Sequence, residues 1–220
     1  MIERVYEAVQ HAEQVTDVIV ATDDDRIYQA VQNFRGKAVM TSGENRSGTD
    51  RVAEAARQLN LSSDDIIINV QGDQPLLDPR SIDELVAPFF SGSNPNMTTL
   101  AYKIVNRNEI TNPKDVKVTF DHQGYALYFS RSPIPFGRDA SYGFDTYKHL
   151  GFYAYKKEFL DAFSQLPDGK LEKIEKLEQL RAIEYGYRML VVVTAYDSPE
   201  VDYPEDIARI EAILKQRLEK

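Results

Sequence analysis

The apolar residues of the first ninety positions alternate between a helical and a strand-like spacing. Ile2, Val5, Tyr6 and Val9 are three or four residues apart, which places them on one face of a helix. Further helices are predicted at about 27–34, at 49–59 and from 81 onward, and strands at about 15–22, 37–41 and 65–70. This alternation favours an α/β fold with a doubly wound, mostly parallel sheet that binds ligands at the carboxyl ends of its strands. The continuous apolar run 65–70 is typical of a strand buried in a parallel sheet.

The second half of the chain has a different pattern. Residues 116–120 and 125–129 flank a polar turn, which predicts a β-hairpin. Strands are then expected at 149–155 and 188–195, and helices at about 156–165, 171–185 and 204–218. We therefore predict a single domain over residues 1–220, with a small antiparallel insertion at about 112–135.

Composition excludes several classes of function. The 220 residues include 26 Lys and Arg and 35 Asp and Glu, so the formal net charge is −9. This acidic balance argues against binding to nucleic acid or to an anionic membrane surface. The chain has no Cys, which excludes disulfides, thiol nucleophiles and thiolate metal ligands. It also lacks a run of 18 apolar residues, so no membrane-spanning helix is expected.

Two acidic residues are expected near the edge of the sheet where its strands end and ligands bind. Asp73 follows Gly72 and the predicted strand at 65–70, and Asp202 lies just before Pro204. Carboxylate oxygens in such positions suit Mg²⁺. The alternative is local, because Asp73 could stabilise a turn and Asp202 could cap the last helix.

Three other polar features leave alternatives open. Asp23–Asp25 resembles the Asp-x-Asp metal site of glycosyltransferases, but the acidic first turn of a helix is the favoured interpretation. Ser47–Arg51 offers helix N-terminal amides for an anion or a base edge, or simply a helix cap. His11, His122 and His149 are too scattered for a zinc site, and His149 fits either a structural role or a ligand contact.

The order and spacing of these motifs identify a family. The segments that carry the resemblance are Ala21-Thr22-Asp23, Ser47–Arg51, Asn69–Pro75, Ala126–Arg131, His149-Leu150-Gly151, Leu177–Arg181 and Val201–Asp206. Together they resemble the 3-deoxy-manno-octulosonate cytidylyltransferases, also called CMP-Kdo synthetases. The resemblance extends over essentially the whole chain.

This resemblance implies a nucleotidyltransferase-like fold that transfers CMP from CTP to the anomeric hydroxyl of 3-deoxy-manno-octulosonate (Kdo). Pyrophosphate is released, and the product serves lipopolysaccharide synthesis in the bacterial cytoplasm. The resemblance also implies a homodimer and a Mg²⁺ cofactor held by Asp73 and Asp202. The implied nucleotide-binding residues are Ala21, Thr22, Ser47, Gly48, Thr49 and Arg51, and the implied sugar-binding residues are Gln71, Arg131, Arg138, His149, Tyr153, Glu178 and Gln179.

One departure from the family concerns its first strand and basic phosphate-binding loop. This chain starts at Met1-Ile2, where that family pattern ends, so we expect the 220 residues alone to have little activity. Two alternatives follow: a related sugar nucleotidyltransferase, or a noncatalytic sugar- or nucleotide-binding subunit. A glycosyltransferase built on Asp23–Asp25 is a further one.

Overall fold

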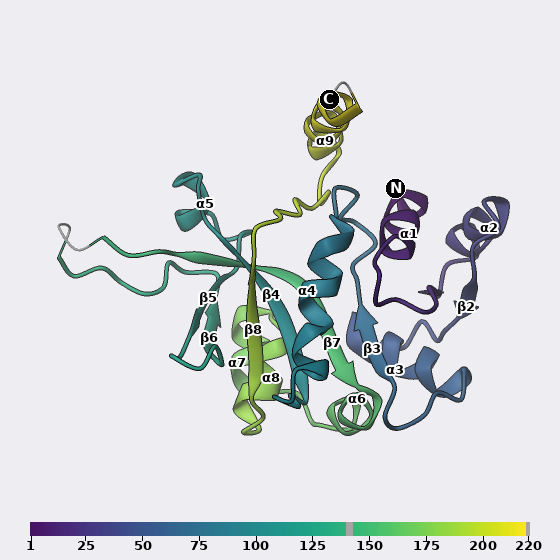
Figure 1. Cartoon of the computed structure of the whole chain (residues 1–220), viewed down its shortest axis with the longest axis horizontal. Helices are drawn as coiled ribbons and strands as arrows, with labels where there is room; N and C mark the ends of the chain where they lie inside the picture. The colour runs from purple at the N-terminus through teal and green to yellow at the C-terminus, as the bar shows by residue number, and fades with distance from the viewer. Residues whose placement is uncertain (140–142, 219–220) are drawn as a thin grey trace.

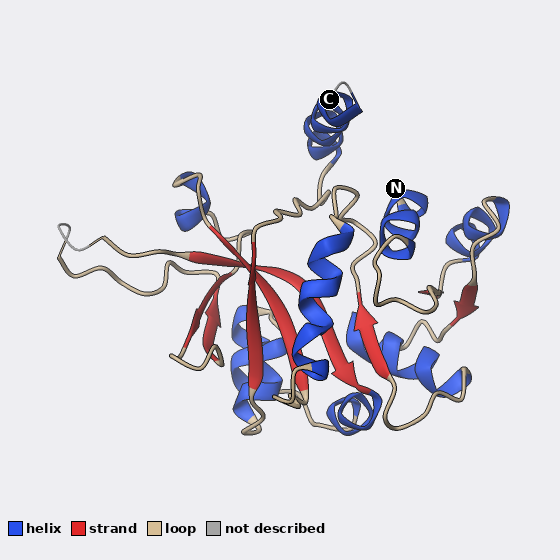
Figure 2. Cartoon of the chain, viewed as in Figure 1, coloured by secondary structure: helices blue, strands red, loops and turns tan. Residues whose placement is uncertain are grey.

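The computed structural model describes residues 1–139 and 143–218 as an α/β fold (Figures 1 and 2). The strands are β1 (Val20–Thr22), β2 (Ala38–Met40), β3 (Ile66–Asn69), β4 (Met97–Lys103), β5 (Lys117–Phe120), β6 (Ala126–Ser130), β7 (Tyr147–Lys156) and β8 (Met189–Thr194). The helices are α1 (Ile2–Gln10), α2 (Asp25–Asn33), α3 (Gly48–Gln58), α4 (Pro79–Phe90), α5 (Asn108–Thr111), α6 (Lys157–Ser164), α7 (Lys170–Glu175), α8 (Gln179–Glu184) and α9 (Pro204–Leu218).

The long strand β7 organises the main sheet. It pairs antiparallel with β3, β4 and β5, while β4 pairs in parallel with β8. Strands β3, β4 and β8 therefore point the same way, and β7 runs against them. The α/β class is confirmed, but the parallel pairing expected for the 65–70 strand is wrong, because its described partner is the antiparallel β7. A continuous apolar run indicates burial and does not reveal the direction of the neighbouring strand.

Strands β1 and β2 form a separate parallel pair beside the main sheet. Within residues 1–139 and 143–218, β1 pairs only with β2 and β3 pairs only with β7. Helix α3 contacts both β1 and β3 and so links the two sheets. Of the strand expected at 15–22, only Val20–Thr22 has the conformation of a strand, because the short pairing with β2 covers just these residues.

Helices cover both faces of the main sheet, as a doubly wound fold requires. Because side chains alternate along a strand, Phe152 and Tyr153 of β7 enter different buried clusters. Phe152 packs with Val5 and Val9 of α1 and with residues of α4. Tyr153 belongs to the cluster formed with α3, α6 and α8. The apolar face predicted for the first helix is thus buried, so this prediction is confirmed.

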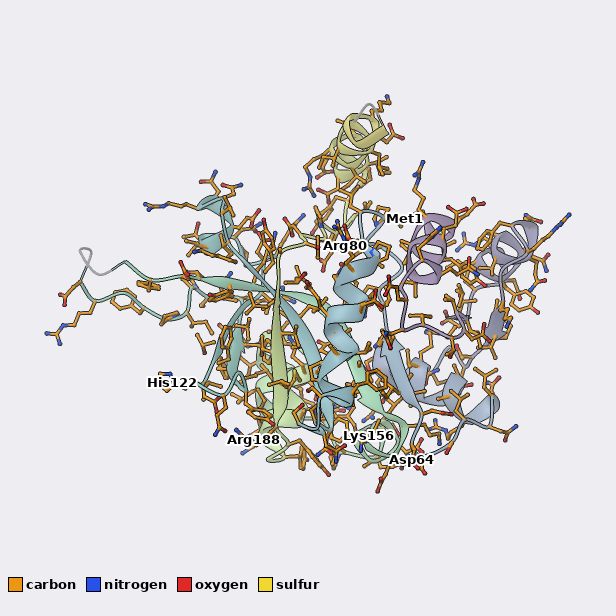
Figure 3. All side chains as sticks on the ribbon, viewed as in Figure 1. Met1, Asp64, Arg80, His122, Lys156 and Arg188 are labelled. Atoms are coloured by element: carbon orange, nitrogen blue, oxygen red, sulfur yellow. The ribbon has the colours of Figure 1, made fainter. Side chains whose placement is uncertain are left out.

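The predicted hairpin and the helix at 171–185 have different outcomes. Strands β5 and β6 pair antiparallel, and Figure 3 shows His122 at their turn, away from the sheet. The helix expected at 171–185 is instead divided into α7 and α8, because Lys176 adopts a left-handed conformation with φ of 56°. None of the described helices is long and apolar enough to cross a membrane.

Candidate active site

Four segments converge at the carboxyl end of β3: the N-terminus of α3, the loop after β3, the middle of β7 and the start of α8. A Cβ atom placed on Gly48 of α3 would lie 3.9 Å from the side-chain amide of Gln71. A Cβ atom on Gly151 of β7 would lie 3.9 Å from Gln71 Cγ and from Glu200 Oε1. Gly151 also has a φ of +71°, a conformation that favours glycine. The chain thus approaches Gln71 closely from two sides.

The N-terminus of α3 carries a buried polar cluster. Ser47 caps the helix by accepting a hydrogen bond from the Asp50 amide at 3.2 Å. The hydroxyl of Thr49 bonds the Glu178 carboxylate and lies 3.3 Å from the Tyr155 hydroxyl. Glu178 Oε2 is buried and has no hydrogen-bond partner among the described residues. An acceptor of this kind beside helix N-terminal amides suits a ligand hydroxyl or a polar base edge.

A buried ion cluster fixes α3 against α8. Arg181 is 1% exposed and donates to both oxygens of Glu172, at 2.8 and 2.5 Å. It also faces Asp50 of α3 at 4.0 Å, and Arg46 donates to that aspartate at 2.7 Å. Hydrogen bonding to Glu172 raises the pKa of Arg181 despite its burial. A bidentate ion pair therefore joins Arg181 of α8 to Glu172 of α7, and the charge of Arg181 faces Asp50 of α3, the helix that carries Thr49.

His149 lies on β7 beside Gln179, the first residue of α8. Burial lowers the pKa of His149 to about 3, so its imidazole is neutral at neutral pH. The Thr99 hydroxyl donates its proton to the Phe152 carbonyl at 2.7 Å and lies 2.8 Å from His149 Nε2. Since Thr99 has no second proton, we assign the imidazole proton to Nε2. Nδ1 then accepts from the Gln179 amide at 3.4 Å.

Tyr153 continues this row of side chains along β7. Its ring centroid lies 5.3 Å from that of His149 and 5.9 Å from that of Tyr155. Burial and the nearby Glu178 raise the pKa of Tyr153 well above its ordinary value. The phenol is therefore a neutral hydrogen-bonding group.

Three carboxylates gather at the other end of the site. The Val201 amide donates to the Asp73 carbonyl at 2.9 Å, which brings Asp202 and Glu200 next to the loop after β3. Burial, together with the charges of Asp73 and Asp202, raises the pKa of Glu200 to about 7. Burial and the charge of Asp202 also raise the pKa of Asp73. Each of these negative charges opposes ionisation of its neighbours, and a bound cation would offset that effect.

No group of three or more His, Asp or Glu side chains in the described part of the chain is placed to hold a metal ion, so the fit to Mg²⁺ depends on Asp73 and Asp202. Asp73 Oδ1 is buried and lacks a hydrogen-bond partner in the described part of the chain. The Asp202 carboxylate accepts no hydrogen bond from the described residues; Asp206 accepts the backbone amides of Asp202 and Tyr203 instead. The capping interpretation of Asp202 is therefore wrong, and two unfilled oxygen donors of the kind that Mg²⁺ prefers remain.

The predicted base-binding residues lie at the ends of β1 and β2. Ala21 and Thr22 end β1, and Arg51 of α3 reaches toward them. Arg51 donates to the Thr41 hydroxyl at 2.7 Å and pairs with Asp23 at 3.1 Å. The Asp24 carboxylate accepts the Arg26 amide at 2.8 Å and caps α2, as expected for an acidic first turn. This observation favours the helix interpretation of Asp23–Asp25 over a glycosyltransferase metal site.

The sequence model of the cytidylyltransferases matches residues 1–194. The chain belongs to the cytidylyltransferase family. It is 62% identical to a 3-deoxy-manno-octulosonate cytidylyltransferase of Desulfosudis oleivorans, covering 97% of this chain and 86% of the relative. It is 53% identical to an 8-amino-3,8-dideoxy-manno-octulosonate cytidylyltransferase of Shewanella baltica, over 96% of this chain and 86% of that one.

A solved structure agrees with this assignment. The chain resembles CMP:2-keto-3-deoxy-manno-octonic acid synthetase complexed with CTP, with a TM-score of 0.91 and 39% identity. The match covers 98% of this chain and 88% of that one. The resemblance to CMP-Kdo synthetases inferred from the sequence is confirmed.

Two of the residues predicted to bind the sugar form no described contact with the polar cluster around Thr49 and Glu178. Arg131 donates to the carbonyl oxygens of Glu175, Pro113 and Lys176, at 2.8, 3.0 and 3.4 Å. Arg138 is exposed on the loop between β6 and β7 that extends beyond the sheet, and it contacts no described side chain through a hydrogen bond or ion pair (Figure 1). Their roles in sugar binding stay predictions.

Other residues of the site were not predicted. Asn69 donates to the Thr49 hydroxyl at 3.5 Å, and Tyr155 joins the same cluster. Gln74 is fully buried and donates to the Leu150 carbonyl at 2.8 Å and to Glu200 at 3.1 Å. The sequence did contain a signal for these residues, because Asn69 and Gln74 lie in the same motif as Asp73, and Glu200 is two residues before Asp202.

Proposed function

We propose that this cytidylyltransferase transfers CMP from CTP to Kdo and releases pyrophosphate, with Mg²⁺ held by Asp73 and Asp202. Family membership supports the reaction, and the name of the Desulfosudis relative, 3-deoxy-manno-octulosonate cytidylyltransferase, supports the acceptor sugar. One observation carries the proposal: two polar groups converge on Gln71 from two sides. One is the carboxylate group with Glu200, and the other is the polar cluster around Thr49 and Glu178.

In the proposed reaction the anomeric oxygen of Kdo bonds to the α-phosphorus of CTP. The bond from that phosphorus to pyrophosphate breaks, and the hydroxyl proton is released. Bound Mg²⁺ would withdraw charge from the phosphates and stabilise the leaving pyrophosphate. Asp73 and Asp202 would supply the oxygen donors, a role supported by the charge of Asp202, which contributes to raising the pKa of Asp73.

The chain's own polar groups would orient the two substrates. The N-terminus of α3 lies beside Gln71 at Gly48, and its amides would favour negative charge or an acceptor on the base. Glu178 Oε2 would accept a substrate hydroxyl, because it is buried and has no partner among the described residues. His149 stays neutral and accepts a hydrogen bond from the Gln179 amide. Its imidazole would therefore carry no charge when the sugar acid binds.

The test is pyrophosphate release from CTP and Kdo, with CMP-Kdo identified by mass spectrometry. Activity should need Mg²⁺ and should fall at least a hundredfold in Asp73→Asn, since positioning and charge stabilisation supply most of the catalysis in such transfers. Asp64→Asn is the matched control, because Asp64 precedes β3 at the opposite end of the strand from Asp73 (Figure 3). Undiminished turnover in Asp73→Asn, or in excess EDTA, would refute the assigned metal site.

The same assay separates the alternatives. Turnover of 8-amino-3,8-dideoxy-manno-octulosonate in place of Kdo would indicate the substrate named for the Shewanella relative. Binding of CTP without product would indicate a noncatalytic subunit, which the transferase names of the relatives do not favour.

We also propose a homodimer. Phe136 is 87% exposed and Phe144 is 42% exposed on the loop between β6 and β7. Apolar rings exposed on one extended loop support contact with a second subunit. Light scattering on wild-type protein and on Phe136→Ser tests this, because the variant should shift toward the monomer.

A further inference from the structure

The main observation is a buried lysine that joins two segments at the edge of the candidate site. Lys148 of β7 is 7% exposed. Its Nζ lies 3.0 Å from Glu109 Oε2 of α5 and 3.0 Å from Asp197 Oδ1 in the loop after β8. The ring of Tyr102 is 5.4 Å away. Burial alone would lower the pKa of Lys148, but the two carboxylates raise it, so the ammonium stays charged.

Asp197 begins a segment that carries the proposed metal ligand. Residues 197–202 form neither helix nor strand, and they include both Glu200 and Asp202. Such a segment has no ladder of backbone hydrogen bonds to define its position. Its far end is held by hydrogen bonds from the Val201 amide to the Asp73 carbonyl and from the Gln74 amide to Glu200, and by bonds to Asp206 and Arg209 of α9. Lys148 holds the near end through Asp197.

A cavity beside this segment increases its dependence on polar contacts. The cavity has a volume of about 470 Å³ and is lined by Lys148, Asp197, Glu200 and Asp202 among others. On that side of the segment the described lining is mostly polar, with Leu150 and Pro199 as its apolar members. The Lys148–Asp197 pair is less screened than a surface pair because its lysine is buried.

We propose that Lys148 is a positioning residue that holds the 197–202 segment through Asp197, so that Asp202 stays aligned with Asp73 to bind a divalent cation. This inference rests on the proposed function of the two aspartates. Lys148 itself does not contact the cation in this proposal. It acts through one ion pair and the backbone of six residues.

The experiment measures Mn²⁺ binding to the substrate-free protein by electron paramagnetic resonance, alongside Mg²⁺-dependent turnover. Lys148→Met should weaken Mn²⁺ binding about tenfold and raise the Mg²⁺ concentration needed for half-maximal activity. Lys148→Arg should restore much of both, since it keeps the charge. The matched control is Lys157→Met, which removes a part-buried lysine paired with Asp161 on α6, outside the site.

If Lys148→Met does not fold, Asp197→Asn provides an independent test of the same ion pair. It should weaken Mn²⁺ binding as Lys148→Met does, because it breaks the same pair. Wild-type Mn²⁺ affinity in a folded Lys148→Met or Asp197→Asn variant would overturn the inference while leaving the proposed function intact. A loss of the same size in Lys157→Met would overturn it too, since the effect would then be general. Wild-type protein that binds no Mn²⁺ would refute the proposed metal site and this inference together.

Discussion

Replacing Glu200 with Gln should stabilise the cation-free protein at alkaline pH. Burial and the charges of Asp73 and Asp202 raise the pKa of Glu200 from 4.5 to about 7. The folded state therefore binds this proton more tightly than the unfolded state does. Glu200 lowers the free energy of unfolding as the pH rises through the interval from 4.5 to 7, and the whole cost is present above it.

The size of the effect follows from the pKa difference. At about 1.36 kcal/mol per pKa unit, full ionisation of Glu200 costs ~3 kcal/mol. Part of that cost is already present at pH 5.5, so Glu200→Gln should gain ~2 kcal/mol more at pH 8.5 than at pH 5.5. The comparison between two pH values removes any pH-independent change, such as an altered bond from Gln74.

The assay is urea unfolding in EDTA at both pH values, followed by circular dichroism. Measurements near pH 5.5 avoid the sequence pI of about 4.9, where precipitation is expected. Glu44→Gln, an exposed carboxylate outside the site, subtracts the general effect of losing one negative charge. A gain for Glu200→Gln that differs by less than ~0.5 kcal/mol between the two pH values would refute the reasoning, because the cost of ionising Glu200 would then be absent.

Three further predictions concern the buried ion cluster and the residues proposed to bind the sugar. Arg181→Met should lower the free energy of unfolding by ~3–5 kcal/mol, because Glu172 and Asp50 lose their cation in a buried site. Urea unfolding should show a much smaller loss for the control Arg188→Met, because Arg188 is exposed (Figure 3). Equal losses in the two variants would contradict the argument. Glu178→Gln and Arg138→Ala should each raise KM for Kdo while leaving KM for CTP nearly unchanged in steady-state kinetics, and the opposite pattern would place them in the nucleotide half of the site. Arg131→Ala should lower the free energy of unfolding by ~1–3 kcal/mol, because three carbonyl oxygens lose their donor; normal stability with a raised KM for Kdo would instead place this arginine in the sugar pocket.

The local pattern of the chain was enough to predict most elements. The first helix, the hairpin at 116–129 and the last strand form where apolar spacing and turn residues indicated them. Each depends on interactions within one turn or between adjacent strands. The helix at 171–185 failed for a reason that spacing does not show, since only the left-handed backbone at Lys176 divides it.

The candidate site also has features that the sequence predicted and features that it did not. Asp73, Asp202 and the Ser47–Arg51 turn could be chosen from motif and family resemblance, and the carboxylates do gather. The raised pKa of Glu200, the neutral His149 and the Lys148 pair could not be predicted, because they depend on burial, on charges from other segments of the chain, or on packing of β7 against other segments. The direction of β7 among β3 and β4 was likewise undetermined, since apolar spacing is the same for parallel and antiparallel neighbours. Sequence alone determined which groups could react and which faces are buried, while tertiary packing decided which of them share a low-dielectric site, because desolvation and Coulomb interactions act through space and not along the chain.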